Sequence, residues 1–144
     1  MPHIDKYFKY EPLQFYPHMG PKDADIWNRF VHLNPGFFVG VLYDMRVGQP
    51  EKCDPSLPRN IQDAWHDLCR GRIDVVAERE NHIFIIEVKP RARGEALGQA
   101  INNAHMFKID YNPTKPVYPA VITDVIIPAT RIVAEAHGVA LWTP

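Results

Sequence analysis

Cysteine is scarce in this chain, with only Cys53 and Cys69 among 144 residues. Two cysteines are too few for a disulfide framework and match no zinc-binding spacing, so we expect both to be free thiols. The seven histidines form no i,i+4 pair and no HExxH motif, and the chain has neither a Gly-rich phosphate loop nor a Gly-x-Ser-x-Gly motif. The sequence therefore gives no support to a zinc hydrolase, a P-loop protein or an α/β-hydrolase.

Long apolar runs and a large net charge are also missing. No run approaches the ~18–20 apolar residues that a membrane span needs, and the first residues carry Asp, Lys and Tyr where a signal peptide has an apolar segment. We therefore expect no membrane partner, and a protein that stays inside a cell or is assembled there. A net charge of −1 does not indicate a nucleic-acid-binding protein. Contacts with DNA would have to come from local basic residues, for which Arg72, Arg91 and Arg93 are the candidates.

The length of 144 residues fits one domain, and 46% hydrophobic with 23% charged residues is ordinary for a globular protein. Residues 1–20 stand apart because they combine prolines and aromatic residues without helical or strand periodicity. We predict an extended N-terminal arm over residues 1–20 and one domain over residues 21–144. The aromatic side chains of the arm need a surface to cover. Either the arm wraps around its own domain, or it docks on another subunit or assembly partner.

Two adjacent segments, residues 72–78 and 82–89, are rich in Val, Ile and Phe, which favour β-strands. The three residues between them include no apolar side chain, and Asn81 tolerates the left-handed conformation of a hairpin turn. The two segments are therefore predicted to form a hairpin. A two-residue loop at Glu80 and Asn81 would pair residues whose numbers sum to 161.

In that register Asp74 lies directly opposite Glu87, and both share one face of the hairpin with Lys89. Opposed residues have Cβ atoms only about 4.5–5.5 Å apart, and like charges there repel. Two facing carboxylates invite a hard divalent cation such as Mg²⁺, which keeps several waters and can act on a phosphate. Lys89 can stabilise negative charge on that phosphate. The opposite face is predicted to be apolar and to consist of Ile73, Val75, Ala77, Phe84, Ile86 and Val88.

The same charges have a simpler interpretation. Arg72, which faces Lys89 in this register, could join the two carboxylates in a solvated quartet of diagonal ion pairs, each of which contributes little. A three-residue loop would also shift the register and separate the carboxylates. The charge pattern alone leaves both a metal site and a surface quartet open.

The remaining periodicity places helices and strands on both sides of the hairpin. Pro90 is expected to stop the second hairpin strand, and Ile61, Trp65 and Leu68 are expected to face inward from a short helix. The order of elements predicts an α/β sandwich around a mixed sheet. The expected helices cover residues 21–33, 60–69, 94–107 and 128–137, and the further strands cover residues 37–47, 117–124 and 139–142.

Three features together resemble a known family: Asp74, the run Glu87-Val88-Lys89 at the end of an apolar strand, and a following helix that carries Gln99. They resemble the motif of the PD-(D/E)xK, or restriction-endonuclease-like, nuclease superfamily. The resemblance implies an αβββαβ core with a central mixed sheet flanked by helices. It also implies hydrolysis of DNA phosphodiester bonds with Mg²⁺ or Mn²⁺ as the cofactor.

The resemblance also implies roles for individual residues, and it makes Asp74, Glu87, Lys89 and Gln99 the catalytic set. The metal ligands would be Asp74, Glu87, the Val88 carbonyl and Asp25 of the first helix, while Lys89 would orient or activate the attacking water and Gln99 would position a ligand.

The likeness covers residues 21–142, and two positions depart from the family pattern. Ile73 stands where the proline of the motif name would be. Asn103 stands four residues after Gln99, where a branch that includes exonucleases and Holliday-junction resolvases usually has tyrosine.

The run YDMRVG at residues 43–48, together with the hairpin, is also similar to small proteins of tailed bacteriophages. This second likeness implies an alternative function. The nuclease-like fold would serve as a structural or adaptor component at the head–tail junction or neck of a virion, without a need for catalysis. The protein would then be found in the cytoplasm of the host cell or in the virion, and residues 1–20 would make the assembly contact.

Overall fold

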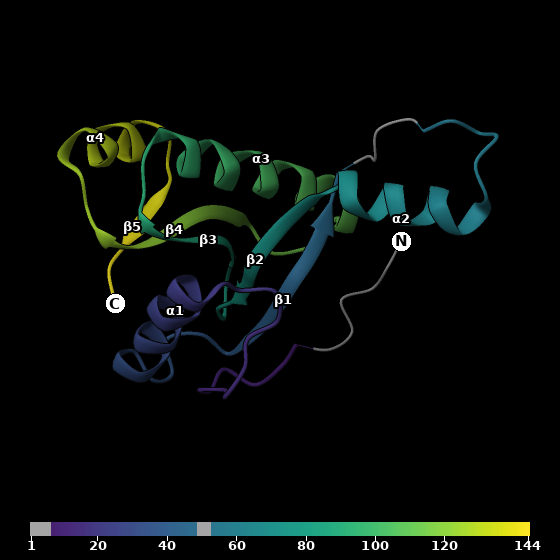
Figure 1. The fold of residues 1–144 in the computed structure, drawn as a ribbon. Helices are drawn as coiled ribbons and strands as arrows, with labels where there is room; N and C mark the ends of the chain where they lie inside the picture. The colour runs from purple at the N-terminus through teal and green to yellow at the C-terminus, as the bar shows by residue number, and fades with distance from the viewer. Residues whose placement is uncertain (1–6, 49–52) are drawn as a thin grey trace.

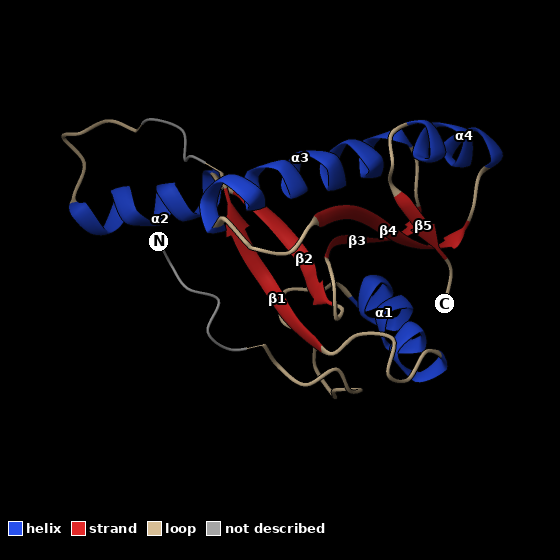
Figure 2. Ribbon diagram, turned by 180° about the vertical axis from the view of Figure 1, so that it is seen from behind, coloured by secondary structure: helices blue, strands red, loops and turns tan. Residues whose placement is uncertain are grey.

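The computed structural model describes residues 7–48 and 53–144. A five-stranded sheet forms the centre, with α3 and α4 over one face and α1 over the other (Figures 1 and 2). The order of elements confirms the predicted α/β class and the αβββαβ core, with α2 inserted between the first two strands. The elements are α1 (Pro21–Leu33), β1 (Gly40–Val47), α2 (Arg59–Cys69), β2 (Gly71–Glu78), β3 (Ile83–Arg91), α3 (Gly94–Tyr111), β4 (Val117–Val125), α4 (Pro128–Ala136) and β5 (Ala140–Trp142).

The sheet is mixed and its strands follow the order β1-β2-β3-β4-β5. β2 is antiparallel to β1 and β3, whereas β4 runs parallel to β3 and β5. Val75 pairs with Ile86, and the Arg79 N–H donates to the His82 carbonyl over 2.8 Å, so facing residues sum to 161. The predicted hairpin register is therefore confirmed.

Two apolar layers hold the helices on the sheet. Beneath the sheet, α1 contributes the apolar stripe predicted for it, and its Trp27 and Phe30 rings stack with centroids 5.8 Å apart. Above the sheet, Phe107 of α3 is fully buried. The lower layer includes Ile26, Trp27, Phe30, Val75, Ala77, Phe84, Ile86 and Val88, and the upper layer includes Val47, Ile73, Val76, Ile83, Ile85, Ala104 and Phe107.

Ile73 lies on the face opposite to the predicted one. It packs in the upper layer beneath α3, whereas Val75, two residues later, packs in the lower layer against α1. Regular alternation would put both on one face. The interruption falls at Asp74, where the facing residue of β1, Asp44, has a left-handed backbone with φ of 53°. A residue in this conformation breaks the regular pleat, so the face changes at this point.

β3 continues through Pro90 to Arg91, so the expectation that Pro90 stops the strand is wrong. Even-numbered residues of β3 direct their backbone N–H groups toward β2, and Pro90 falls in this set. β2 has already separated from β3 at this level, because the last pair between them is Val75 with Ile86. A backbone N–H at position 90 would therefore have no hydrogen-bond partner on β2, so the strand tolerates a residue that lacks this group.

The described part of the arm, residues 7–20, wraps around its own domain. Phe8 exchanges two backbone hydrogen bonds with Val41 of the edge strand β1, at 2.8 and 2.9 Å. The Tyr10 hydroxyl donates to the Asn34 carbonyl, and Tyr16 is 4% exposed within the lower layer. This confirms the wrapping alternative for these residues, while residues 1–6 lie outside the described part of the chain.

A substitution at Gly40 should test how firmly the arm is held. A Cβ atom at Gly40 would lie 2.7 Å from Tyr7 Cβ, which cannot retreat without moving the backbone of the arm. We expect Gly40→Ala to lower the free energy of unfolding by about 1–3 kcal/mol, the usual range for overpacking, and to make residues 7–20 easier to proteolyse. Denaturation midpoints and limited proteolysis measure both effects. Gly20→Ala, with nothing within 4 Å of the added Cβ, is the control, and equal losses in the two variants would contradict the prediction.

The helix α2 does not pack as predicted. Ile61 and Trp65 were expected to face inward, yet they are 46% and 43% exposed, and Figure 1 shows α2 extending away from the sheet. The side chain of Leu68 lies outside the described part of the structure. An amphipathic pattern fixes which face of a helix is apolar, but it does not fix that this chain supplies the covering surface. No helix of the described residues is long and apolar enough to cross a membrane.

Candidate active site

The candidate active site lies where β2 and β3 separate beyond Val75 and Ile86, a point that we call the fork. In a regular ladder the Val88 N–H would bond to the carbonyl of Ile73. Instead it donates to Oδ2 of Asp74 over 2.9 Å, so a side chain replaces the missing rung. The N–H and C=O groups of a strand residue point to the same side. The Val88 carbonyl therefore faces the fork together with the Asp74 carboxylate.

Each hairpin strand follows a different neighbour beyond the fork. β2 stays paired with β1 as far as Gly71, while β3 stays paired with β4 as far as Arg91. The side chain of Arg72 points back to β1, where its Nε lies 2.9 Å from Oδ1 of Asp44. His18 Nε2 lies 3.0 Å from the other oxygen of Asp44, so the arm also contacts this network. Arg72 is thus paired with Asp44, and no ion pair among the described residues joins it to Asp74 or Glu87.

Glu87 lies beside Asp74 and is a buried residue, at 4% exposure. Asn103 of α3 donates its side-chain amide to Oε1 of Glu87 over 2.9 Å. The two carboxyl groups are close enough for each to act on the pKa of the other. The facing arrangement that the register predicted thus places both acids in the same cavity lining.

Burial dominates the electrostatics of this pair. Burial and, after it, the neighbouring Asp74 charge raise the pKa of Glu87 to about 8, against the lowering effects of the Asn103 hydrogen bond and of Lys89. Burial also raises the pKa of Asp74, against the lowering effect of the Val88 N–H. The two adjacent carboxyls thus resist ionisation together, and a positive charge placed beside them would favour their ionised forms.

A cavity of about 470 Å³ opens at the fork and gathers most of the predicted site residues. Gln99 and Lys89 both line it, so the helix predicted to face the acids does so. The lining includes two glycines, which have no side chain to fill the cavity. Three amide side chains in the lining supply hydrogen-bonding groups. The lining consists of Gly71, Arg72, Asp74, Glu87, Lys89, Gly98, Gln99, Asn102 and Asn103.

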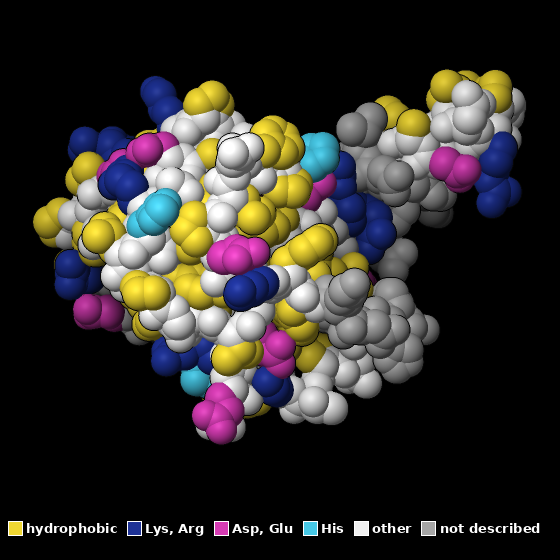
Figure 3. Space-filling view, turned by 90° about the horizontal axis from the view of Figure 1, so that it is seen from below, with side chains coloured by type: hydrophobic (Ala, Val, Ile, Leu, Met, Phe, Trp, Pro, Cys, Tyr) yellow, Lys and Arg dark blue, Asp and Glu magenta, His cyan; other side chains and the backbone are white. Residues whose placement is uncertain are grey.

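Arg91 and Arg93 lie outside this cavity lining. Both side chains are exposed, Arg91 at the end of β3 and Arg93 at the N-cap of α3. In Figure 3 the Lys and Arg side chains form small groups among acidic and apolar ones on the face shown. This distribution agrees with a net charge of −1. A nucleic-acid contact on that face would therefore rest on a few local residues.

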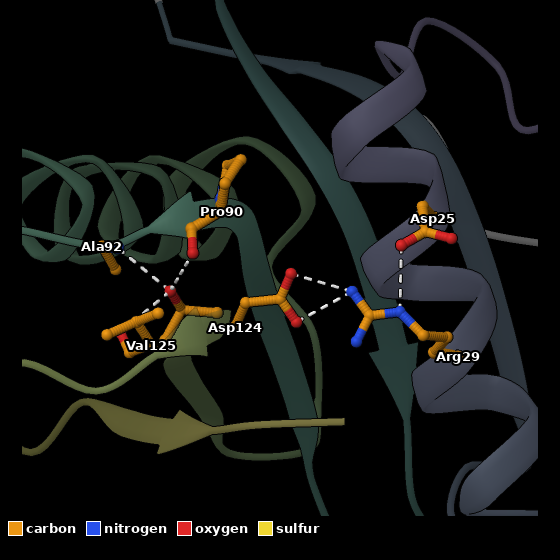
Figure 4. Close-up of polar contacts among 7 residues, drawn as sticks. Asp25, Arg29, Pro90, Ala92, Asp124 and Val125 are labelled. Atoms are coloured by element: carbon orange, nitrogen blue, oxygen red, sulfur yellow. Dashed lines mark hydrogen bonds and ion pairs between the residues drawn. The ribbon is translucent and has the colours of Figure 1, made fainter.

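Asp25 is not brought to the fork. Its carboxylate accepts a hydrogen bond of 2.9 Å from Arg29 one turn later, and Arg29 also binds Asp124 at the end of β4 (Figure 4). Next to these ion pairs, the Thr123 hydroxyl accepts a hydrogen bond of 3.0 Å from the Ala92 N–H and fixes the chain that follows β3. Asp25 thus helps to tie α1 to β4.

Asp23 is the carboxylate of α1 whose charge acts on the site. Partial burial raises the pKa of Asp23 while Lys89 lowers it, and the charge of Asp23 in turn raises the pKa of Asp74. The sequence carried a signal for this difference. Asp23 precedes the buried Ile26 and Trp27 by three and four residues, so it lies on the inward face of the helix.

Asn103 is the second residue whose place at the site was not predicted. The sequence showed it only as a departure from a tyrosine, although its spacing of four residues from Gln99 puts both on one side of the helix. The structure places both residues on the cavity wall, and Asn103 is the one that contacts Glu87.

The donor set at the fork fits a hard divalent cation. Among the described residues no group of three or more His, Cys, Asp or Glu side chains is arranged to hold a metal. The fork offers two carboxylates and one strand carbonyl, and Mg²⁺ is commonly held by one or two carboxylates together with several waters. Each acid already uses one oxygen for a protein donor, Oδ2 of Asp74 and Oε1 of Glu87, which leaves a second oxygen on each.

The raised pKa of Glu87 predicts how the stability of the metal-free protein depends on pH. Between about 4.5, the ordinary value, and about 8 the native state holds a proton that the unfolded state has lost. The free energy of unfolding should therefore fall as pH rises through this window and level off above it. Glu87→Gln should remove this part of the slope, because glutamine accepts the Asn103 hydrogen bond without titrating. Denaturant midpoints at pH 5, 6.5, 8 and 9 with chelator test this, and parallel curves for both proteins would contradict it.

No protein-family model matches the chain, and no curated protein matches it. Two solved structures are similar to it. One is a repair endonuclease from Pyrococcus abyssi, with 14% identity and a TM-score of 0.43 over 71% of this chain and 38% of that one. The other is a protein of unknown function, with 20% identity and a TM-score of 0.46 over 78% of this chain and 53% of that one. The chain thus spans less than two thirds of the length of either protein.

Proposed function

We propose that the chain is a Mg²⁺- or Mn²⁺-dependent nuclease that hydrolyses phosphodiester bonds of DNA. The observation that carries the proposal is the adjacent Asp74 and Glu87 at the fork. Glu87 is buried and Asp74 is partly buried, the pKa values of both are raised, and both line a cavity that Lys89 also lines. A surface quartet of ion pairs would be solvated, and within the described part of the chain neither acid pairs with Arg72 or Lys89 at 4 Å or less.

Asp74, Glu87 and the carbonyl of Val88 would hold the cation. When bound, it would supply Lewis acidity and would lower the pKa of a water molecule that it binds. The Val88 N–H and the Asn103 amide hold the two carboxylates in place. Asp23 would add negative charge near the site and would strengthen the attraction for a divalent cation.

Lys89 would act on the substrate. Its ammonium group is a compact charge on a flexible stem and forms no ion pair with a described residue, so it can orient the attacking water and stabilise the charge on the phosphate. Gln99 of α3, which also lines the cavity, would position a ligand by hydrogen bonding. Arg72 would bind a neighbouring phosphate, with Asp44 fixing its guanidinium, while Arg91 and Arg93 would contact DNA outside the cavity.

A cleavage assay tests the proposal. Linear, circular and branched DNA should be cut in the presence of Mg²⁺ or Mn²⁺ and left intact in chelator, and Glu87→Gln should remove the activity. Asp63→Asn, on the projecting helix α2, is the control because Asp63 pairs only with Arg59 at the surface among the described residues. Cleavage that survives both chelator and Glu87→Gln would come from a contaminant or another site and would refute the proposal.

The alternative function, an adaptor of a bacteriophage virion in the host cytoplasm or the particle, is supported by one observation. α2 projects from the domain with Ile61 and Trp65 exposed, as an assembly element would. The described part of the arm supports it less, because residues 7–20 already cover their own domain. Sedimentation of the parent and of Trp65→Glu tests this alternative. The adaptor hypothesis predicts a concentration-dependent oligomer that dissociates in Trp65→Glu. The hypothesis fails if both proteins are monomers at every concentration.

A further inference from the structure

The side-chain nitrogen of Asn103 donates two hydrogen bonds. Its Nδ2 donates to Oε1 of Glu87 over 2.9 Å and to the backbone carbonyl of Arg72 over 3.1 Å. Both partners accept, so the nitrogen of the amide, and not its oxygen, must face them. The residue is 5% exposed. A buried amide with both N–H groups in use is fixed in orientation.

The surroundings of Asn103 hold it from two further sides. Its neighbours on α3, Ala100, Ala104 and Phe107, are buried on the sheet, so the helix cannot slide or rotate freely. On the strand side, a Cβ atom at Gly71 would lie 3.0 Å from Oδ1 of Asn103 and 3.3 Å from a methyl group of Val47. Glycine at position 71 therefore leaves room for the amide, and a larger residue would press on it.

In each of the two acids, one carboxylate oxygen accepts a hydrogen bond from the protein. The Val88 N–H occupies Oδ2 of Asp74, and Asn103 occupies Oε1 of Glu87. Each carboxylate is thereby oriented by a protein donor and keeps its other oxygen for a cation. The second bond of Asn103 also ties Glu87 to the backbone of Arg72, whose side chain lines the same cavity.

We infer that Asn103 is a positioning residue that holds the Glu87 carboxylate ready for a divalent cation and fixes it relative to Arg72. The inference rests on the proposed function, because it concerns the same site. Donors in the second layer around metal ligands typically change metal affinity by about 10–100-fold when they are removed.

The experiment measures Mn²⁺ affinity in the protein without DNA, by titration with electron paramagnetic resonance detection. Asn103→Leu keeps the size of the side chain and removes the donor, and it should weaken Mn²⁺ binding at least about tenfold. Gly71→Ala keeps Asn103 but presses on its amide, so it should weaken binding in the same direction and covers the case in which Asn103→Leu does not fold. Asn60→Leu is the matched control: this asparagine is exposed on α2 and lies outside the cavity lining, so the same chemical change should leave Mn²⁺ affinity unchanged.

A purely structural role would give a different pattern. Asn103→Leu would then melt at a lower temperature but would bind Mn²⁺ with the parent affinity once folded, and that result overturns the inference. A parent protein that binds no Mn²⁺ refutes the proposed function itself, so the two failures are distinguishable. A further readout is the side-chain amide resonance of Asn103, identified by its loss in Asn103→Leu. Mg²⁺ should shift this resonance, and an unmoved resonance with Mg²⁺ bound would also overturn the inference.

Discussion

Lys89→Ala is expected to reduce the turnover number for DNA hydrolysis by about 10²–10⁴-fold, the range typical of losing a group that handles a proton or charge in the transition state. The same change should leave the affinity for Mn²⁺ nearly unaltered. Lys89 lies beside the acid pair and lines the cavity without bonding to either carboxylate among the described residues. Removing its charge relieves repulsion of a cation but also removes an effect that favours ionised Glu87, and the two changes oppose each other.

The measurement combines single-turnover cleavage at saturating DNA with Mn²⁺ titration of the DNA-free protein. Lys108→Ala is the matched control, because Lys108 is exposed near the end of α3 and outside the lining of the cavity. Lys89→Arg keeps the charge but changes its shape, so a partial recovery of turnover would identify charge as the larger contribution. A variant that needs more DNA yet reaches the parent turnover at saturation would show that Lys89 only binds substrate.

The local sequence was sufficient to predict the hairpin and the pair of acids. Strands rich in β-branched residues, separated by a polar turn with Asn81, fix the register once the loop length is known. Because side chains alternate, this register alone brings Asp74 and Glu87 together, and the structure adds only that the ladder ends just before them. The prediction succeeded because each step depended on residues that are close in sequence.

The features that could not be predicted depend on residues far apart in sequence. The change of face at Ile73 accompanies the left-handed Asp44, which belongs to another strand. The tolerance of Pro90 requires that β2 has already separated from β3. Trp65 is exposed because no other described segment covers it, which no pattern within the helix reveals. Periodicity identifies the faces of an element, whereas the partner of each face is decided by the whole fold.

Asp74→Asn should remove the metal response of the protein while leaving the metal-free fold intact. Asparagine can still accept the hydrogen bond from the Val88 N–H, so the contact between β2 and β3 at the fork is kept. The substitution also removes a charge whose burial and proximity to Glu87 disfavour the native state. We therefore expect the metal-free melting temperature to stay unchanged or to rise, by about 2–4 °C if about 1 kcal/mol of repulsion is relieved. The gain should be larger at pH 9 than at pH 6, because Glu87, with a pKa of about 8, is ionised only at the higher pH.

Thermal melts of the parent and of Asp74→Asn, each with chelator and with millimolar Mg²⁺, measure both effects. A ligand that binds only the native state at 100 times its dissociation constant stabilises it by about 2.7 kcal/mol, and this stabilisation should be present in the parent and lost in Asp74→Asn. Asp74→Ala provides the contrast, because it leaves the Val88 N–H without its acceptor and should lower metal-free stability by about 1–3 kcal/mol. An ion-pair role for Asp74 would produce the opposite signs: a parent whose melting ignores Mg²⁺ and Mn²⁺, and an Asp74→Asn protein that is less stable in chelator. That combination would end the nuclease hypothesis, since the two acids would then hold the fold together through lysine or arginine and would have no cation to bind.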